Sequence, residues 1–177
     1  RAIVAHQGHT AEQAARHFGA RYASTDAEEI FNDDSIDVVW ITTSHQSHAD
    51  LAIDALQSGK HVFLEKPVAL NNDDARRVAD AAAAADRLLT VGFNRREAPA
   101  SELLARELAN TTGPFQIVYR VLGDHLPDDH WLDDLVLGGG RILGEGVHFF
   151  DWMSWLTGER PTLVHASGGA KGLDFTA

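Results

Sequence analysis

Short apolar runs alternate with helix-like segments along the first half of the chain. The strand-like runs lie at residues 1–5, 37–43, 61–64 and 88–93. The helix-like segments lie at residues 11–18, 26–31, 47–57 and 72–86. The run at 37–43 is unbroken and β-branched, which is typical of a strand buried on both faces. This alternation predicts an α/β fold with a doubly wound parallel sheet and crossover helices on both faces.

Polar residues mark where three of these helices should begin. Thr10 with Gln13, and Thr25 with Glu28, have the spacing of a capping box, and Asn72 is expected to cap the long helix. Glycines close the first and third helices, as is common at helix C-termini.

The regular alternation of strand-like and helix-like segments ends after residue 93. Helices are predicted at 99–110 and 142–156, and strands at 115–122 and 162–166. A domain boundary is expected near residues 94–113, which divides the chain into the parts 1–95 and 96–177. The chain opens on a strand already under way and stops abruptly, so we expect a piece of a longer protein.

Composition and charge narrow the classes of function. The chain has 177 residues, of which 44% are apolar and 23% charged, so it can bury a core. Its net charge of -11 disfavours nucleic acid and anionic membranes as partners, and no apolar stretch is long enough to span a membrane. The absence of cysteine excludes thiolate metal sites and cysteine nucleophiles, and it fits a cytoplasmic protein.

Lys66 directly follows a predicted strand, within the tripeptide Glu65-Lys66-Pro67. The carboxyl ends of strands line the ligand crevice in open α/β sheets. A lysine at this place can donate to a reacting oxygen, and desolvation would lower its pKa. The alternative is a surface lysine beside a glutamate on a loop, and both interpretations stay open.

His148 lies in an apolar predicted helix between two acidic residues. Glu145, His148 and Asp151 are spaced three apart, so they share one helical face. A neighbouring anion raises the pKa of a histidine and fixes its tautomer, which favours a proton-transfer role for His148. A structural histidine hydrogen-bonded inside a core is the alternative.

Two further patterns are interpreted as structural. Three glycines at 138–140 precede a helix and could cradle a phosphate, but acidic residues come just before them, so a close-packing turn is expected. Histidines at 45, 48, 125 and 130 match no compact zinc pattern, so no metal site is predicted. A metal-dependent hydrolase that uses these histidines is retained as a third hypothesis.

Four stretches resemble one known family of oxidoreductases. They are residues 43–48, 59–70 with the sequence GKHVFLEKPVAL, 92–94, and 138–151 with GGGRILGEGVHFFD. In this order they resemble the glucose-fructose oxidoreductase, inositol dehydrogenase and MocA (Gfo/Idh/MocA) family over nearly the whole chain. The forms at 92–96 and 138–141 are similar to the branch fused behind an alcohol-dehydrogenase-like domain.

The resemblance implies a nicotinamide-dependent dehydrogenase. Residues 1–95 would form a Rossmann domain for NAD or NADP that lacks its first strand and glycine loop. Residues 96–177 would form part of a substrate and oligomerisation domain with an open, mainly antiparallel sheet. Hydride transfer between the nicotinamide and a sugar, polyol or related substrate is implied, as is a homo-oligomer.

The resemblance also assigns roles to individual residues. Lys66 matches the active-site lysine of the family, and His148 matches its motif histidine. His148 would exchange the proton of the reacting hydroxyl while Lys66 polarises its oxygen. The residues that fall where the family touches the cofactor are Thr43, Ser44, His48, Glu65, Lys66 and Asn94.

Several positions depart from the family pattern. Gly144 stands where an aspartate commonly precedes the motif histidine by four residues, and Ser44 stands where a proline is common. No G-x-G-x-x-G occurs in residues 1–40, and Ala5 aligns with the acidic residue that would bind the ribose, so NAD and NADP both stay open. Gly144 favours a second hypothesis, a non-catalytic family member that binds a sugar or a protein partner.

A gap in the sheet is the last expectation. In the doubly wound strand order 3-2-1-4-5-6 the first strand lies between the second and the fourth. The runs 1–5 and 37–43 correspond to the second and fourth strands. We therefore expect these two runs to lack a common neighbour, which would leave unpaired backbone groups and a marginally stable chain.

Overall fold

The fold is described from a computed structural model. It describes residues 1–167 except 112, 115, 124 and 128. The first half contains β1 (Ala2–Val4), α1 (Gly8–Phe18), β2 (Tyr22–Ser24), α2 (Glu28–Phe31), β3 (Val38–Ile41), the 3-10 turn η1 (His45–Ser47), α3 (His48–Gln57), β4 (His61–Leu64), α4 (Asn72–Ala84) and β5 (Leu89–Val91). The second half contains η2 (Asn94–Glu97), α5 (Pro99–Leu108), η3 (Trp131–Asp133), the π-helical turn η4 (Ile142–Gly146) and α6 (Val147–Thr157).

The strands form two separate parallel sheets. β1 pairs with β2, and β3, β4 and β5 form a second sheet in that order. Within the described residues no ladder joins β1 to β3, so the outer edge of β3 carries unpaired backbone groups. The expected gap between these two strands is confirmed. β2 was not expected from the sequence, because three residues without an apolar run give no strand signal.

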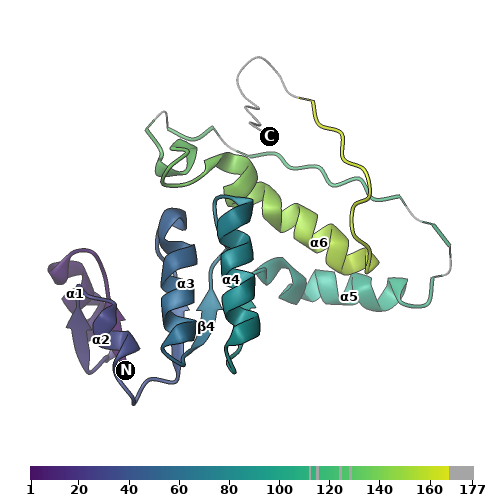
Figure 1. The fold of residues 1–177 in the computed structure, drawn as a ribbon. Helices are drawn as coiled ribbons and strands as arrows, with labels where there is room; N and C mark the ends of the chain where they lie inside the picture. Colours follow the sequence, from purple (N-terminus) through teal and green to yellow (C-terminus); the bar gives the residue numbers. More distant parts are fainter. Residues whose placement is uncertain (112, 115, 124, 128, 168–177) are drawn as a thin grey trace.

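One face of the larger sheet is covered by helices. Figure 1 shows α3 and α4 side by side over β4, and the core lies between them and the sheet. The buried strand residues alternate with exposed ones along β3, where Val38 and Trp40 are 52% and 72% exposed. The expectation of burial on both faces is therefore wrong, because both crossover helices of this sheet pack on the same side.

The helix starts differ in detail from the expected caps. α1 begins at Gly8, before Thr10, and has no side-chain cap. At the start of α2 the carboxylate of Asp26 accepts from the backbone N–H of Glu28 at 3.0 Å, so Thr25 is not the cap. Asn71, one residue before the expected position, caps α4 by accepting from the backbone N–H of Asp74.

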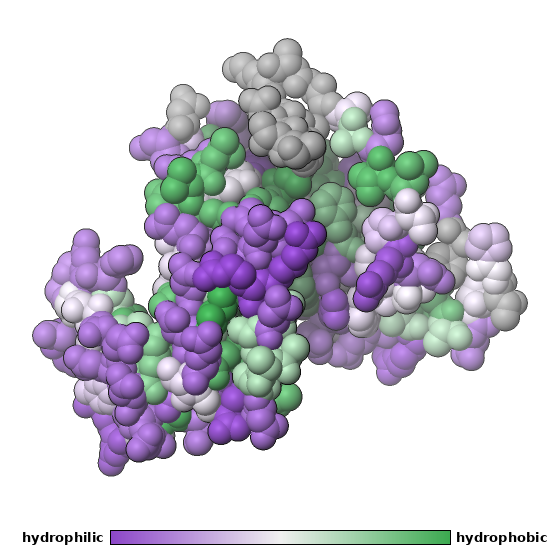
Figure 2. Space-filling view, viewed as in Figure 1, coloured by the Kyte–Doolittle hydropathy of each residue, from purple (hydrophilic) through white to green (hydrophobic). Residues whose placement is uncertain are grey.

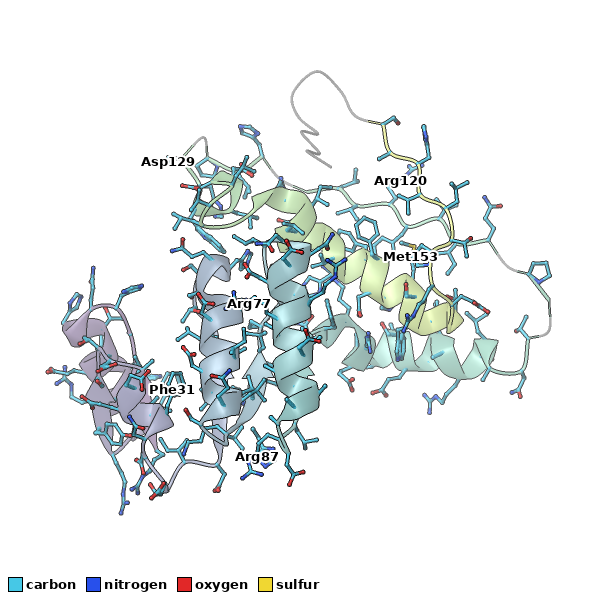
Figure 3. All side chains as sticks on the ribbon, viewed as in Figure 1. Phe31, Arg77, Arg87, Arg120, Asp129 and Met153 are labelled. Atoms are coloured by element: carbon cyan, nitrogen blue, oxygen red, sulfur yellow. The ribbon has the colours of Figure 1, made fainter. Side chains whose placement is uncertain are left out.

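Charged and polar side chains cover the outer surfaces of α1, α2, α3 and α4 (Figure 2). Arg77 of α4 lies beside α3, where it pairs with Asp50 at 3.1 Å and with Asp74 of its own helix at 2.6 Å (Figure 3). These ion pairs are largely exposed, so they contribute little to stability. The buried apolar contact between α3 and α4 is the stronger link.

The second half is helical where strands were also expected. α5 and α6 lie against each other, and Trp152 Nε1 donates to Ser101 Oγ at 2.8 Å between them. Residues 116–122 and 162–166 form no strand, and Phe115 lies outside the described residues. An extended segment is a strand only when a neighbour pairs with it, and the part of the chain that is described offers these segments none. The predicted α/β class is confirmed by the first half.

Candidate active site

The carboxyl ends of β3, β4 and β5 lie level at one edge of the larger sheet. The backbone N–H of Glu65 donates to Ile41 O at 2.9 Å, and that of Gly92 donates to Leu64 O at 2.8 Å. The residues singled out from the sequence, except His148, lie in the segments that follow these strand ends. Ligands bind at this edge in open α/β sheets, so the fold gathers the candidate residues where a site is expected.

Lys66 links this edge to the second half of the chain. Its Nζ donates a hydrogen bond to the backbone carbonyl of Gly144 in η4 at 2.5 Å. Burial lowers the pKa of Lys66, an effect that Glu65 and Glu145 oppose and the positive charge of Arg95 reinforces. The expectation that desolvation lowers the pKa of this lysine is confirmed.

Position 144 has no room for a side chain. A Cβ atom on Gly144 would lie 2.2 Å from Cδ1 of Leu132, which is buried. The family resemblance led us to expect an aspartate here. The chain has a glycine instead, and the side chain of Leu132 from η3 occupies the space that an aspartate side chain would need. What this position contributes to the site is its backbone carbonyl.

His148 lies near the start of α6 with an unsatisfied ring nitrogen. Its Nδ1 is buried and has no hydrogen-bond partner among the described residues. Its ring stands edge-on to Phe93 of the neighbouring strand end, with centroids 6.3 Å apart. Burial lowers the pKa of His148, and the positive charges of Lys66 and Arg95 lower it further.

The two carboxylates flanking His148 are bound by arginines. Asp151 accepts from Arg96 Nε at 2.8 Å and from a second guanidinium nitrogen, and Glu145 accepts from Arg141 at 3.2 Å. The pKa of His148 is lowered overall, against expectation, because burial and the positive charges of Lys66 and Arg95 outweigh the effect of Asp151, which does raise it. Arg96 lies 55 positions from Asp151 in the sequence. An ion pair between residues so far apart cannot be predicted from a local sequence pattern.

His48 contacts two of the backbone segments that carry the candidate residues. It is fully buried, with Nδ1 2.7 Å from Pro67 O and Nε2 3.1 Å from Thr43 O. Its ring thus bridges the segments that follow β3 and β4. Its expected contact with a cofactor stays a prediction, and its observed role is to hold two strand ends together.

His45 ties the same edge to the glycine run. Its buried Nδ1 lies 2.7 Å from Gly138 O, and burial lowers the pKa of His45. A Cβ atom on Gly138 would lie 2.5 Å from Leu132 Cα, and one on Gly139 would lie 2.5 Å from Leu70 Cδ2. The glycine run is confirmed as a close-packing turn. This contact with His45 had not been expected.

The remaining candidates line the edge with polar groups. Thr43 Oγ1 lies 2.7 Å from Ser47 Oγ, and Ser44 O accepts from the same hydroxyl at 2.8 Å. The carboxylate of Glu65 packs against Gly92, where a Cβ atom would lie 3.1 Å from it. Asn94 is exposed at the start of η2. Their contacts with a cofactor stay predictions.

These groups fit the nicotinamide half of a dinucleotide and a small polar substrate. The buried Nδ1 of His148 lacks the partner that buried polar atoms normally have, and a bound ligand can supply it. Lys66, Thr43 and Asn94 add donors around the same strand ends. In the described ranges no group of three or more histidine or acidic residues could hold a metal ion, and no helix is long and apolar enough to cross a membrane.

The fold and this edge define a Rossmann-type nucleotide-binding protein. Residues 1–93 match the family model for Gfo/Idh/MocA proteins, described as an oxidoreductase family with an NAD-binding Rossmann fold. The chain belongs to this family. The narrower resemblance to the branch fused to an alcohol-dehydrogenase-like domain stays a prediction.

Relatives and solved structures agree with this family. The chain is 33% identical to myo-inositol 2-dehydrogenase of Thermotoga maritima over 85% of its length and 45% of the relative's length. It is 30% identical to levoglucosan dehydrogenase of Pseudarthrobacter phenanthrenivorans over 84% and 40%. The crystal structure of an oxidoreductase domain protein from Kribbella flavida superposes with a TM-score of 0.80 at 31% identity, covering 89% of this chain and 43% of that one. The chain thus spans less than half the length of these proteins.

Proposed function

We propose that this chain forms the nucleotide-binding and catalytic part of an NAD(P)-dependent dehydrogenase that acts on a hydroxyl or carbonyl group of a sugar or polyol. The observation that carries the proposal is the hydrogen bond from Lys66 to Gly144, because it brings the ammonium group to the turn that precedes His148. The relatives named above act on inositol and levoglucosan. A solved levoglucosan dehydrogenase contains NADH together with levoglucosan, so NAD is favoured over NADP.

Lys66 and His148 take complementary parts in this reaction. Lys66 Nζ donates to the reacting oxygen and polarises its bond to carbon. His148 exchanges the hydroxyl proton through its imidazole ring, whose Nδ1 has no hydrogen-bond partner among the described residues. Because burial lowers the pKa of His148, the imidazole is neutral at physiological pH and can accept that proton. A bound nicotinamide supplies the hydride chemistry.

The division of labour follows the two parts of the chain. In the proposal residues 1–95 bind the cofactor, with Thr43, Ser44, Glu65 and Asn94 around its nicotinamide half. Residues 96–177 carry His148 and help to form the substrate side and a homo-oligomer contact. Family membership and the matched span of residues 1–93 support this assignment.

A second candidate function is sugar or partner binding without catalysis. The observation that favours it is Gly144, since no carboxylate stands at that position and both nearby carboxylates are paired with arginines. Such a protein would keep the fold and lose the chemistry. It would bind a sugar or a protein partner at the same edge.

Fluorescence titration with NADH and NADPH, followed by a turnover assay with inositols, anhydrosugars and aldoses, separates these functions. Binding of NADH with sugar-dependent reduction of NAD supports the dehydrogenase. NADH binding without turnover of any substrate favours the second candidate, and binding of neither nucleotide overturns the proposal. For these 177 residues alone we expect a Kd above ~1 μM, because residues 1–40 contain no G-x-G-x-x-G loop for the pyrophosphate.

A further inference from the structure

The carboxylate that this site lacks at position 144 has a substitute one residue further on. We propose that Glu145, together with the Gly144 carbonyl, positions the ammonium group of Lys66. The inference rests on the proposed function, because it assigns a positioning residue to the same site. Glu145 would act through Lys66 and would not touch the reacting atoms.

First, position 144 has no space for a carboxylate side chain. Leu132 is 6% exposed, and its side chain occupies the space that a Cβ atom on Gly144 would need. A carboxylate at this position would have to displace a buried leucine. The acidic residue nearest to this position in the chain is Glu145.

The second step is the backbone of η4. Residues 142–146 form a π-helical turn, a rare local geometry that often occurs at functional sites. Within this turn the Gly144 carbonyl accepts the hydrogen bond from Lys66 Nζ at 2.5 Å. Glu145 is the next residue, so its backbone is held close to the same ammonium group.

The third step is the restraint on the Glu145 carboxylate. Arg141 lies one turn earlier, and its guanidinium lies 3.2 Å from each carboxylate oxygen of Glu145. This pair holds the carboxylate over η4. Both side chains are a little more than one-third exposed, so water screens the pair.

The charges that reach Lys66 come from several elements. Glu65 and Glu145 favour its charged form, and Arg95 disfavours it. The charge of Lys66 in turn lowers the pKa of His45 and of His148. Of the two carboxylates, Glu65 precedes Lys66 in the chain, whereas Glu145 is brought in by the second half.

The test measures the reactivity of Lys66 against pH in the Glu145→Gln variant. A limiting amount of acetic anhydride acylates only unprotonated amines, and mass spectrometry of peptides reports each lysine separately. Removing the negative charge lowers the pKa of Lys66 further, so at a fixed pH below that pKa we expect a roughly two- to fivefold faster acylation. Glu145→Asp keeps the charge and should restore most of the wild-type profile.

The controls are built into the chain. Lys60 is 5% exposed and donates to Asp33 O at 2.8 Å, away from η4, so its profile should not change. Glu159→Gln removes a carboxylate after the end of α6 and should leave both lysines unchanged. An unchanged Lys66 profile in Glu145→Gln overturns the proposal. So does a joint gain at Lys66 and Lys60, because it would show that Glu145 only holds the fold.

The readout needs neither cofactor nor substrate. A shifted Lys66 profile in a protein that turns over no substrate would therefore reject the proposed dehydrogenase and leave the geometry around Lys66 intact. A protein with normal turnover and an unshifted profile would reject the role of Glu145 alone.

Discussion

Replacing Gly144 by alanine tests how tightly Leu132 closes the position before His148. A Cβ atom on Gly144 would lie 2.2 Å from Cδ1, 3.2 Å from Cγ and 3.3 Å from Cδ2 of Leu132. Leu132 is buried, so its side chain has little room to turn away. Gly144 is not among the glycines with a positive φ, so alanine adds no backbone strain and steric overlap dominates the effect.

The magnitudes follow from this overlap. Gly144→Ala should lower the free energy of unfolding by ~1–3 kcal/mol, the usual cost of overpacking a core. Leu132→Ala should lower it by ~2–5 kcal/mol, because it removes a buried side chain and leaves a cavity. In the double variant the new methyl group enters the vacated space, so the loss should be smaller than the sum by ~0.5–3 kcal/mol.

Urea unfolding followed by tryptophan fluorescence and circular dichroism measures all three variants. Gly146→Ala is the matched control, because it lies in the same π-helical turn. A Cβ atom there would lie 3.5 Å from Phe150 and 3.6 Å from Ile142, which is ordinary contact. Wild-type stability of Gly144→Ala, or strictly additive losses in the double variant, would refute the packing argument.

Two further predictions concern the first half of the chain. Separately from the homo-oligomer contact, the unpaired edge of β3 should make the isolated 177-residue chain self-associate, and Trp40→Lys should weaken this about tenfold, because burying a large apolar side chain is worth ~1.5–3 kcal/mol and Trp40 is exposed on β3 beside Phe63. Phe18→Lys on α1 is the control, and equal sedimentation of Trp40→Lys and wild type would contradict the prediction. Hydrogen bonds from Ser35 lower the pKa of Asp33 to about 2. Its stabilisation is therefore complete above pH ~4 and lost as the pH falls towards 2, so acid unfolding curves of wild type and Asp33→Asn should converge there.

The elements of the first half could be predicted because their signals are local. The apolar runs and helix-like segments depend on residues within one or two turns of each other. Gly19 ends α1 in the left-handed conformation with a φ of 68°, as its position after the helix indicates. The expected gap beside β3 followed from strand order, a rule of the fold that the sequence pattern can invoke.

The failures involve contacts between distant parts of the chain. Trp40 looks like a core residue in the sequence, and its exposure depends on which side α3 and α4 pack. The segments 116–122 and 162–166 have strand patterns but find no pairing neighbour among the described residues.

In the site, too, the features with local signals were predicted and the long-range contacts were not. Lys66 and His148 were found from their positions in two motifs. The carbonyl of Gly144, the closure by Leu132 and the pairing of Asp151 with Arg96 come from residues 12 or more positions apart and have no local signature. The pKa of His148 was predicted in the wrong direction for this reason, since burial and the positive charges of Lys66 and Arg95 outweigh the effect of Asp151.

The most direct test of the proposed chemistry is sugar-dependent NAD reduction by the protein that carries this chain, compared with its Lys66→Met variant. Methionine keeps the length of the side chain and removes the ammonium group. Lys66→Met should lower the turnover number by ~10²–10⁴-fold, the usual contribution of an acid–base group. Unchanged turnover in Lys66→Met would remove Lys66 from the mechanism and contradict the central claim.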